Sequence, residues 1–459
     1  MVSMLLKRIE ELEARLAQNS SNSSRPPSSD PPNVSSGKTR GSSGRKRGGQ
    51  PGHKKNERSV VAVEQVDEVT SLKPKRCRSC DKALHGSDPA PYRHQVFEVP
   101  EVKARVHEYQ LHSLCCDGCQ KVTRAELPAG VPTGQFGPRL CAIVAVCSGA
   151  YRLSKRSVEE LIADFFGVEI SLGTIANLEQ ATSMALAHPV EEIARAIQQE
   201  PVVHADETGW YERSKRAWLW AAVTAQMAVF LISPSRATRV AKELLGAAFA
   251  GILISDRWSA YNFVDATRRQ LCWAHIARDF KAFADHGPQA RVLSGKLGPL
   301  VDAMFHHWHR VRDGTLARLA FQELMQPIQA EVEACLKQGT SIQSIARKCR
   351  RILKVQATLW LFVHTEGIEP TNNRGERAVR HAVLWRKSSF GTDSPNGSRF
   401  VERILTTVTT LRLQNRNVLD YVTTACRDAL CGRQPPSLLP ASQHAASLAS
   451  SDPILRIAA

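Results

Sequence analysis

The stretch that decides the fold is residues 202–232, VVHADETGWYERSKRAWLWAAVTAQMAVFLI. Apolar runs at 202–206, 217–223 and 228–232 are separated by short polar segments. Runs of this length with β-branched and aromatic residues predict three strands joined by short turns.

The pattern changes after the third strand. A helix is predicted over 236–245, a strand over 251–255 and a further strand near 268–273. Successive strands followed by helix–strand alternation predict a mixed sheet. Residues 285–365 are predicted to be wholly helical, and a helix resumes from Asn372. The sequence therefore predicts a multidomain α/β protein with a long helical insertion.

Three acidic residues have positions that suit metal chemistry. Asp206 and Asp256 each follow an apolar strand, and Glu376 begins a helix. Acids at the carboxyl ends of two strands point into a shared crevice. Three oxygen ligands suit Mg²⁺ or Mn²⁺, and two ions about 4 Å apart would support displacement at a phosphate. In the alternative, the aspartates cap strand ends and Glu376 pairs with nearby arginines.

Basic residues surround the third acid. Arg374, Arg377 and Arg380 lie three apart on the helix of Glu376, and we expect them to hold DNA phosphates. Pairing with neighbouring acids is the alternative. The formal net charge is +17; residues 1–60 hold 12 basic and 5 acidic side chains, and residues 371–416 hold 9 and 3. Two such basic segments indicate a polyanionic partner, nucleic acid or an anionic membrane surface.

The cysteines predict a zinc site. Cys77 and Cys80 form one CxxC pair, and Cys116 and Cys119 form a second. Four thiolates in two such turns can bind one Zn²⁺ tetrahedrally. The alternating segment 95–109 is expected to form a small β insert between the pairs. Ordinary buried cysteines are the alternative, and adjacent Cys115 is left as a spare thiol.

The N-terminal 60 residues predict a helix followed by a tether. Leucine and isoleucine at positions 5, 9, 12 and 16 form the stripe of a short coiled coil, or of a simple amphipathic helix. The Ser/Pro/Gly-rich segment after it cannot form a core. We expect it to be a disordered arm, not a mere linker, that reaches DNA phosphates through a basic group: Arg45, Lys46, Arg47, Lys54 and Lys55.

Residues 154–179, SKRSVEELIADFFGVEISLGTIANLE, read as helix, glycine turn and helix. Leu161, Phe165 and Val168 fall on one side, and Gly167 supplies the turn. This pattern is typical of a DNA-binding helix-turn-helix, although any helical hairpin can share it.

Composition and length bound the compartment. The longest apolar stretch, residues 217–232, is shorter than the roughly 20 residues of a membrane helix. Charged residues near the start replace the apolar segment of a signal peptide. We therefore expect a cytoplasmic protein whose cysteines are thiols or metal ligands.

Several motifs together resemble the transposases of the bacterial insertion sequence 66 family. They are HADET with Asp206, SDRWSAYN with Asp256, CWAH at 272–275 and NNRGERAVR with Glu376. The resemblance extends over nearly the whole chain, including the GGQPGHKK segment and the double CxxC. Gly375 stands where that family more often has alanine. We expect this glycine to cost about 1 kcal/mol of helix preference and to loosen the approach of Glu376.

The resemblance implies a DDE-type transposase with a ribonuclease-H-like core and the acidic triad Asp206, Asp256 and Glu376. It implies metal-assisted hydrolysis at the element's ends, then attack of the freed 3′-hydroxyl on target DNA. Cys272-x2-His275 resembles a pair found in DDE transposases with a helical insertion, and the resemblance implies an accessory role: holding His275 near the scissile phosphate or anchoring the insertion. A packed cysteine and a surface histidine are the alternative. Partners implied are terminal repeats, target DNA, further copies of the chain and companion proteins of the element, with no membrane and a nucleoid-associated location.

The expected organisation can now be stated. It comprises a coiled-coil helix (1–18), a basic tether (19–60), a zinc knuckle (70–125), a helix-turn-helix-like region (133–198), the first part of the core (199–284), the helical insertion (285–369), the helix of the third acid (370–390), a C-terminal family segment (391–435) and a disordered tail (436–459). Two other functions remain open: a zinc-dependent DNA-binding protein with an inactive core, and a nuclease of the same fold.

Overall fold

A computed structural model describes the following parts of the 459-residue chain: 4–5, 8–9, 12–13, 16 and 60–441. The chain separates into two compact units, residues 37–103 and a larger unit formed by 1–36 and 104–459. The helices described in the larger unit are α2 (Pro138–Gly149), α3 (Lys155–Phe166), α4 (Leu172–Ala185), α5 (Ala187–Ile197), α6 (Thr238–Leu245), α7 (Trp273–Ala282), α8 (Pro288–Arg312), α9 (Arg318–Gly339), α10 (Ala346–Leu353), α11 (Leu361–His364), α12 (Asn373–Ser389), α13 (Pro395–Leu413) and α14 (Val418–Leu430).

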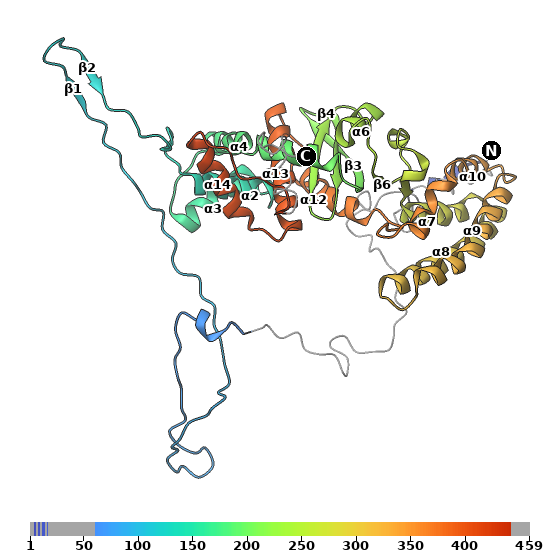
Figure 1. Ribbon diagram of the computed structural model, residues 1–459, viewed down its shortest axis with the longest axis horizontal. Coiled ribbons are helices and arrows are strands. Elements are labelled where there is room, and N and C mark those ends of the chain that lie inside the picture. The colour runs from blue at the N-terminus through green and yellow to red at the C-terminus, as the bar shows by residue number, and fades with distance from the viewer. Residues whose placement is uncertain (1–3, 6–7, 10–11, 14–15, 17–59, 442–459) are drawn as a thin grey trace, which may run out of the picture. The chain divides into compact units, whose positions relative to one another are not determined.

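A five-stranded mixed sheet lies at the centre of the larger unit (Figure 1). Its strands are β3 (Val202–Glu212), β4 (Lys215–Val223), β5 (Ala228–Ser233), β6 (Ile252–Ser255) and β7 (Arg269–Leu271). Their order is β5-β4-β3-β6-β7. β3, β4 and β5 pair antiparallel, whereas β6 pairs parallel with β3 and β7 parallel with β6. The predicted mixed sheet and its five strands are confirmed.

The first strand is longer than predicted. β3 continues beyond Asp206 to Glu212, so the expectation that it ends at Asp206 is wrong. A two-residue turn at Arg213 and Ser214, with φ of 49° and 62°, joins β3 to β4. Such left-handed turns usually carry glycine or asparagine, and this one carries neither, so the sequence did not show where the first strand ends. The polar residues after Asp206 remain in the strand because β4 pairs with all of them.

The two faces of β3 contact different helices. Side chains alternate along a strand, so Ala205 and Asp206 face opposite ways. Ala205 belongs to a core shared with α5 and α6, while Trp210 packs with Ala378 of α12 and Val401 of α13. Asp206 lies on the side of Trp210, so it faces α12.

Helix α13 protects the edge of the sheet. Thr410, Thr406 and Glu402, four residues apart, accept hydrogen bonds from successive outward N–H groups of β5 at 3.1, 3.1 and 2.7 Å. An edge strand otherwise presents unpaired donors that promote aggregation. Acceptors one helical turn apart on α13 are spaced like the N–H groups of alternate residues on β5, so all three N–H groups find a partner.

A helical insertion separates β7 from α12. Helices α7 to α11 surround a core that includes Trp273, Phe321 and Phe362. Buried Gln270 of β7 links this core to the sheet, because its amide donates to the Leu359 carbonyl at 3.0 Å and accepts from the Phe362 N–H at 2.9 Å. The predicted helical character of residues 285–365 is confirmed.

The region before the sheet contains a helix–turn–helix pair. Ser154 and Ser171 cap α3 and α4 through their hydroxyl oxygens, and Gly167 ends α3 with φ of 63°. The predicted helices and glycine turn are therefore present. Phe165 was expected on the inner side but is 68% exposed, and Phe166 packs on the small core instead. Leu161 and Val168, expected on the same side, do pack on that small core, so Phe165 alone of the three departs from the prediction.

The N-terminal expectations are met only in part by described residues. Residues 5, 9, 12 and 16 are helical and their side chains are exposed. The coiled coil stays a prediction. Arg45, Lys46, Arg47, Lys54 and Lys55 lie outside the described residues, as does the expected tail beyond residue 441.

The β insert predicted for residues 95–109 is wrong. All of these residues are described, and none is in a strand. Val96, Val99 and Val106 are 78%, 79% and 94% exposed, so alternate apolar residues here bury nothing. Pro100 removes one ladder donor, and without a partner strand the alternation has no sheet to join. Strands β1 (Ser113–Cys115) and β2 (Val122–Arg124) instead flank the second CxxC pair.

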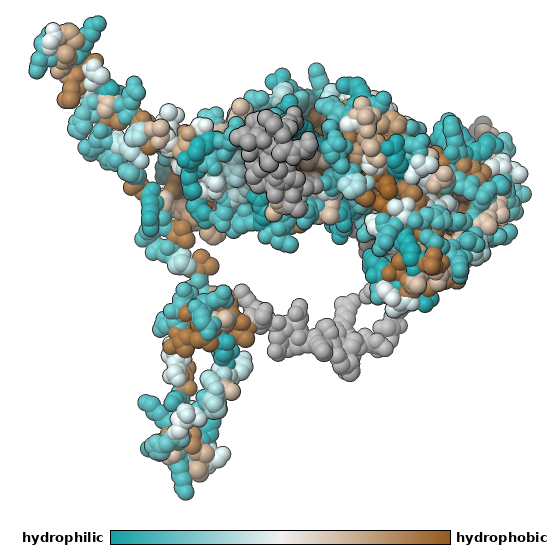
Figure 2. All heavy atoms as spheres, in the orientation of Figure 1, coloured by the Kyte–Doolittle hydropathy of each residue, from teal (hydrophilic) through white to brown (hydrophobic). Residues whose placement is uncertain are grey.

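The surface of the larger unit is largely polar, and hydrophilic side chains cover most of the face seen in Figure 2. Among the described residues, no helix combines the length and the apolar character needed to cross a membrane.

Candidate active site

Strand register brings the two aspartates to one level. β3 and β6 pair in parallel, with His204 opposite Ile254. Two residues further along each chain are Asp206 and Asp256, so the register places them side by side. Asp206 is in the middle of β3, but it lies at the carboxyl end of β6. In sheets with parallel strands this edge is where ligands bind.

Buried Arg269 holds the loop of the second aspartate. Its guanidinium is 4% exposed and donates to the carbonyl oxygens of Asp256 at 2.9 Å and Trp258 at 3.2 Å. It also donates to Ser255 Oγ at 3.3 Å and Asn262 Oδ1 at 2.8 Å. The Trp258 N–H donates to Asp256 Oδ1 at 2.8 Å. These contacts fix both the backbone and the side chain of Asp256.

Asn372 fixes the third acid against β3. Fully buried Asn372 precedes α12, and its amide donates to the carbonyl of Ala205 at 2.8 Å. Its Oδ1 lies 3.1 Å from His204 Nδ1, and its carbonyl accepts the N–H of Glu376 at 3.0 Å. The first turn of α12, with Glu376, is thus attached to the strand segment that carries Asp206.

The three carboxylates share one electrostatic environment. Burial, followed by the negative charges of Glu207, Asp256 and Glu376, raises the pKa of Asp206 well above its usual range. Burial also raises the pKa of Glu376, although the guanidinium of Arg278 opposes this shift. Mutual repulsion of this kind is what a bound cation relieves.

The residues present fit a divalent metal. The three carboxylates come from three separate elements and interact electrostatically with one another at this edge of the sheet. Hard carboxylate oxygens are the ligands that Mg²⁺ and Mn²⁺ prefer. A bound cation would favour the ionised form of each acid and would reverse the upward pKa shifts.

Cys272 and His275 lie beside Glu376. Cys272 precedes α7 and is 1% exposed; its Sγ lies 3.8 Å from Glu376 Oε1, and His275 Nδ1 lies 3.5 Å from the same oxygen. Burial lowers the pKa of His275 to about 4 and raises that of Cys272 to about 12. At neutral pH the imidazole is therefore neutral and the thiol protonated. A cavity of about 280 Å³ is lined by Cys272, His275 and Asp256.

Arg374, Arg377 and Arg380 lie on α12, the helix of Glu376, as the sequence predicts. Arg377 and Arg380 are exposed and Arg374 is half-buried. Within the described part of the chain, none of the three forms an ion pair with an acidic group. The cation that acts on Glu376 is Arg278 of α7, which sequence reasoning missed because α7 is distant in the chain.

Part of the basic excess at 371–416 is structural. Arg386 donates to the carbonyl of Gly209 at 2.5 Å, and Arg403 donates to that of Ser183 at 3.0 Å. Arg416 donates to the carbonyl of Ser437 at 3.3 Å. These guanidiniums fasten helices to their neighbours, so the local charge overstates the number of cations that face DNA.

A second ionic cluster lies on the opposite face of β3. Glu207 accepts from Arg236 at 2.6 Å and from the Tyr261 hydroxyl at 2.6 Å. The Arg236 guanidinium stacks between Trp258 and Trp218, 3.8 and 4.6 Å from their ring centres. The indole N–H of Trp258 donates to the Arg236 carbonyl at 3.1 Å. Through Trp258, this cluster supports the loop after Asp256 on the face of β3 opposite Asp206. No motif in the sequence revealed it.

Gly375 has a structural role that the sequence did not show. A Cβ built at Gly375 would lie 2.8 Å from Asn372 Oδ1 and 2.9 Å from its Nδ2. The amide of Asn372 is held by His204 and the Ala205 carbonyl, so it cannot move away freely. The glycine therefore makes room for the side chain of Asn372, which anchors α12.

We expect Gly375→Ala to lower the free energy of unfolding by about 1–3 kcal/mol, because overpacking displaces a bonded amide. Gly295→Ala is the matched control: it is also in a helix, and a Cβ there meets nothing within 4 Å. That change should stabilise by about 0.5–1 kcal/mol through helix propensity. Urea unfolding measures both. Equal stabilisation by the two alanines would show that Gly375 makes no room for Asn372.

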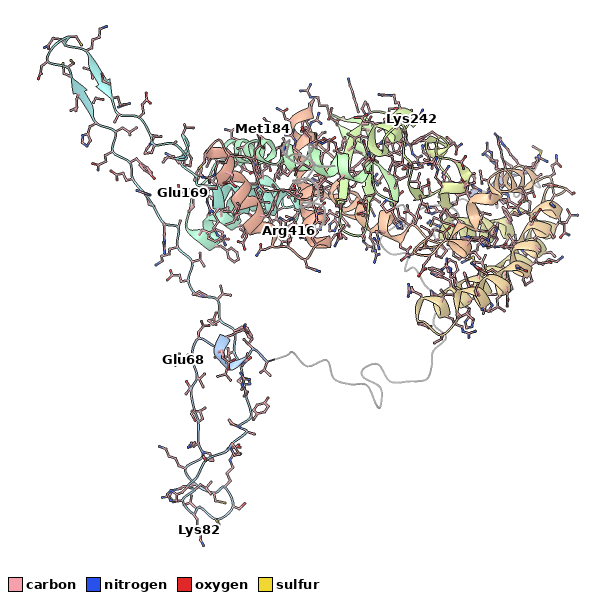
Figure 3. All side chains as sticks on the ribbon, in the orientation of Figure 1. Glu68, Lys82, Glu169, Met184, Lys242 and Arg416 are labelled. Carbon is pink, nitrogen blue, oxygen red and sulfur yellow. The ribbon has the colours of Figure 1, made fainter. Side chains whose placement is uncertain are left out.

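The two CxxC pairs adopt the same turn. The Cys77 N–H donates to the Lys82 carbonyl at 2.9 Å, and the Cys116 N–H donates to that of Lys121 at 2.9 Å. Lys82 is labelled in Figure 3. Hydrogen bonds within each turn lower the pKa of Cys77 and of Cys116.

Cys77 and Cys80 belong to the 37–103 unit, and Cys116 and Cys119 belong to the larger unit. After each pair, the next residue, Asp81 or Gln120, has a positive φ of 54° or 57°. Cys115 is exposed in β1, with its Sγ 3.8 Å from Gln120 Oε1.

Comparison with known sequences gives the family. Residues 133–399, more than half of the chain, match the sequence model described as Transposase IS66 family. The chain belongs to the IS66 transposase family. It is therefore a transposase, an enzyme that cuts and transfers nucleic acid strands and binds DNA, and the mixed sheet with its many helices fits a transposase core. Residues 1–59 match a second model, described as a family of unknown function (DUF6444).

Two proteins of Sinorhizobium fredii (strain NBRC 101917 / NGR234) are similar to this transposase. The uncharacterized protein y4qI is 26% identical over 402 residues, covering 78% of this chain and 71% of its own length. The uncharacterized protein y4hP is 23% identical over 382 residues, covering 74% and 68%. The IS66 resemblance found in the sequence motifs is thus confirmed.

Proposed function

We propose that the protein is a DDE-type transposase that cleaves the ends of an insertion sequence and joins them to target DNA. Asp206, Asp256 and Glu376 are its catalytic acids and the ligands of two Mg²⁺ or Mn²⁺ ions. The observation that carries this proposal is the convergence of three carboxylates from β3, the end of β6 and the first turn of α12. The loop and helix that carry two of them are each fixed by a buried side chain, Arg269 or Asn372.

A ribonuclease-H-like core is supported by the sheet. Numbered from β3, the strand order β5-β4-β3-β6-β7 becomes 3-2-1-4-5, with the first three antiparallel and the last two parallel. The insertion between β7 and α12 then separates the second acid from the third.

The chemistry follows from what the side chains can do. Bound divalent ions supply charge stabilisation for the attacking and leaving oxygens of an in-line phosphodiester displacement. The three acids would hold the bound ions at fixed positions. Arg269 fixes the loop that carries Asp256, and Asn372 fixes the first turn of α12, which carries Glu376. Arg278, with Arg374, Arg377 and Arg380, offers cations for the phosphates beside the acids. The same arrangement serves water as nucleophile in cleavage and a 3′-hydroxyl in joining.

Other parts of the chain are proposed to hold DNA. The second helix of the pair at 154–179, α4, would enter a major groove. Arg45, Lys46, Arg47, Lys54 and Lys55 would contact phosphates without reading sequence. Because two element ends must be joined, we propose a multimer in the DNA complex, helped by companion proteins of the element. Its place is with the bacterial nucleoid, where its substrate lies.

The CxxC pairs are proposed to bind one structural Zn²⁺ through Cys77, Cys80, Cys116 and Cys119. Two turns with matching hydrogen bonds and a left-handed residue after each pair support this role. Thiolates are the zinc ligands, and the lowered pKa of the first cysteine of each pair favours them.

A strand-transfer assay tests the proposed function. The full chain is incubated with Mg²⁺, a labelled duplex carrying an element end, and a target plasmid. We expect cleaved ends and labelled plasmid together. Cleavage without joined product would indicate a nuclease of the same fold, and end binding with neither product would indicate a DNA-binding protein with an inactive core.

A further inference from the structure

We propose that Cys272, His275 and Glu376 form a second metal site, selective for a thiophilic ion such as Zn²⁺, that shares Glu376 with the acidic triad. The proposal rests on the proposed function only for the consequence of sharing Glu376. The binding site itself rests on geometry.

The three ligand atoms have the spacing of a zinc site. They all lie within 4.8 Å of one another, with Sγ and Nδ1 at 3.8 and 3.5 Å from Glu376 Oε1. Zinc bonds of about 2.0–2.3 Å imply tetrahedral edges of about 3.3–3.5 Å. The two separations from Glu376 Oε1 exceed these edges by a few tenths of an ångström. The separation of Cys272 Sγ from His275 Nδ1, within 4.8 Å, also has to close, through rotation of the two side chains.

An unpartnered nitrogen points to a ligand. The Nδ1 atom of His275 is buried without a hydrogen-bond partner. A buried polar atom of this kind calls for an explanation, and a metal ion at the centre of the three atoms supplies one.

The site can be reached and the thiol can be ionised by the metal. The side chains of His275 and Glu376 are 32% and 36% exposed, and the cavity beside them is lined by Cys272. The N–H of Asn372 already donates to Cys272 Sγ at 3.2 Å, which would support a thiolate. When the metal binds, the S–H bond breaks, the metal–sulfur bond forms and the proton leaves to solvent.

The chemistry of the set distinguishes it from the triad. Asp206, Asp256 and Glu376 offer oxygen only, which suits Mg²⁺, whereas a thiolate and an imidazole favour Zn²⁺. The carboxylate of Glu376 cannot fully coordinate a metal ion at the triad and a second one at the Cys272–His275 site at the same time. A thiophilic ion at this site would therefore withdraw the third acid and inhibit cleavage supported by Mg²⁺.

Zinc counting tests the site without an activity readout. The full chain, reduced and freed of metal, is titrated with Zn²⁺ against a fluorescent chelator. We expect two ions per chain, one for the cysteine turns and one for this cluster. Cys272→Ser and His275→Gln should each weaken the second site by at least about 10- to 100-fold. Cys80→Ser should remove the other ion, and the double variant Cys80→Ser, Cys272→Ser should lose both.

Cys426→Ser is the matched control, because Cys426 is also buried and bonds Thr182 through Sγ. It should still bind two ions. An equal zinc affinity of the second site in the unsubstituted chain, Cys272→Ser and His275→Gln would overturn the proposal.

Inhibition separates this site from the proposed function. In cleavage assays with Mg²⁺, Cys272→Ser should need at least about tenfold more Zn²⁺ for half-inhibition of its own rate. Mg²⁺-dependent cleavage with equal zinc sensitivity would refute the shared site and leave the transposase function intact. If Cys272→Ser bound less zinc and the unsubstituted chain showed no Mg²⁺-dependent cleavage, the metal site would stand and the transposase function would be refuted.

Discussion

Asp206→Asn lowers the rate of element-end cleavage at least about 10³-fold, and Asp256→Asn and Glu376→Gln do the same. Each change removes one charge that holds the metal ions, whose stabilisation is worth several kcal/mol, and each 1.36 kcal/mol is about tenfold in rate. End binding should persist, because the arginines of α12 and the helix pair remain. Gel analysis of labelled ends measures cleavage, and mobility shift measures binding.

Stability controls distinguish lost chemistry from lost folding. Without metal, the pKa of Asp206 is higher in the folded state than in the unfolded state. The stability that its protonated form contributes is therefore present below the unfolded-state pKa and is lost as the pH rises through the folded-state pKa. Asparagine removes that penalty, and Asp206→Asn should melt no lower than the unsubstituted protein at pH 7. Glu212→Gln, on the same strand but outside the triad, should keep cleavage. Full cleavage by Asp206→Asn would refute the assignment.

Arg269→Ala should lower the free energy of unfolding by about 3 kcal/mol or more, because a buried guanidinium is removed and its four acceptors lose a charged donor. Its neighbour Arg268 is the matched control: it is exposed, and its guanidinium donates to the Ala250 carbonyl at 3.1 Å. Arg268→Ala should change stability by no more than about 0.5 kcal/mol. Urea unfolding gives both values.

Arg269→Lys separates charge from geometry. Lysine keeps the charge but cannot reach Ser255, Asn262 and two carbonyls in one plane, so an intermediate loss is expected. Cleavage should fall with it, since the loop carries Asp256. If Arg269→Ala cost no more than Arg268→Ala, the guanidinium would not hold this loop.

Sequence patterns predicted the strands well and singled out two aspartates that the strand register places side by side, because both leave local signals. Apolar runs marked each strand, and an acid after such a run marked Asp206 and Asp256. The length of β3 was missed because its turn at Arg213 and Ser214 has no glycine or asparagine. The insert at 95–109 was wrong because alternation predicts a strand only where a partner exists.

The supports of the site could not be predicted, because their partners are far apart in the chain. Asn372 bonds Ala205, and Arg278 acts on Glu376, across long separations that no local pattern records. Cys272 and His275 showed a recognisable spacing, but their third partner lies 104 residues from Cys272. The sequence predicted only a loss of helix preference at Gly375, because the close approach of the Asn372 side chain to this position depends on the fold.

The most direct test of the triad is metal rescue of Asp256→Cys. A thiolate is a poor ligand for Mg²⁺ and an acceptable one for the softer Mn²⁺. Cleavage and joining by this variant should be lost with Mg²⁺ and partly restored with Mn²⁺, while Asp256→Asn stays inactive with both. Equal activity of Asp256→Cys in Mg²⁺ and Mn²⁺ would contradict the claim that Asp256 holds the catalytic metal.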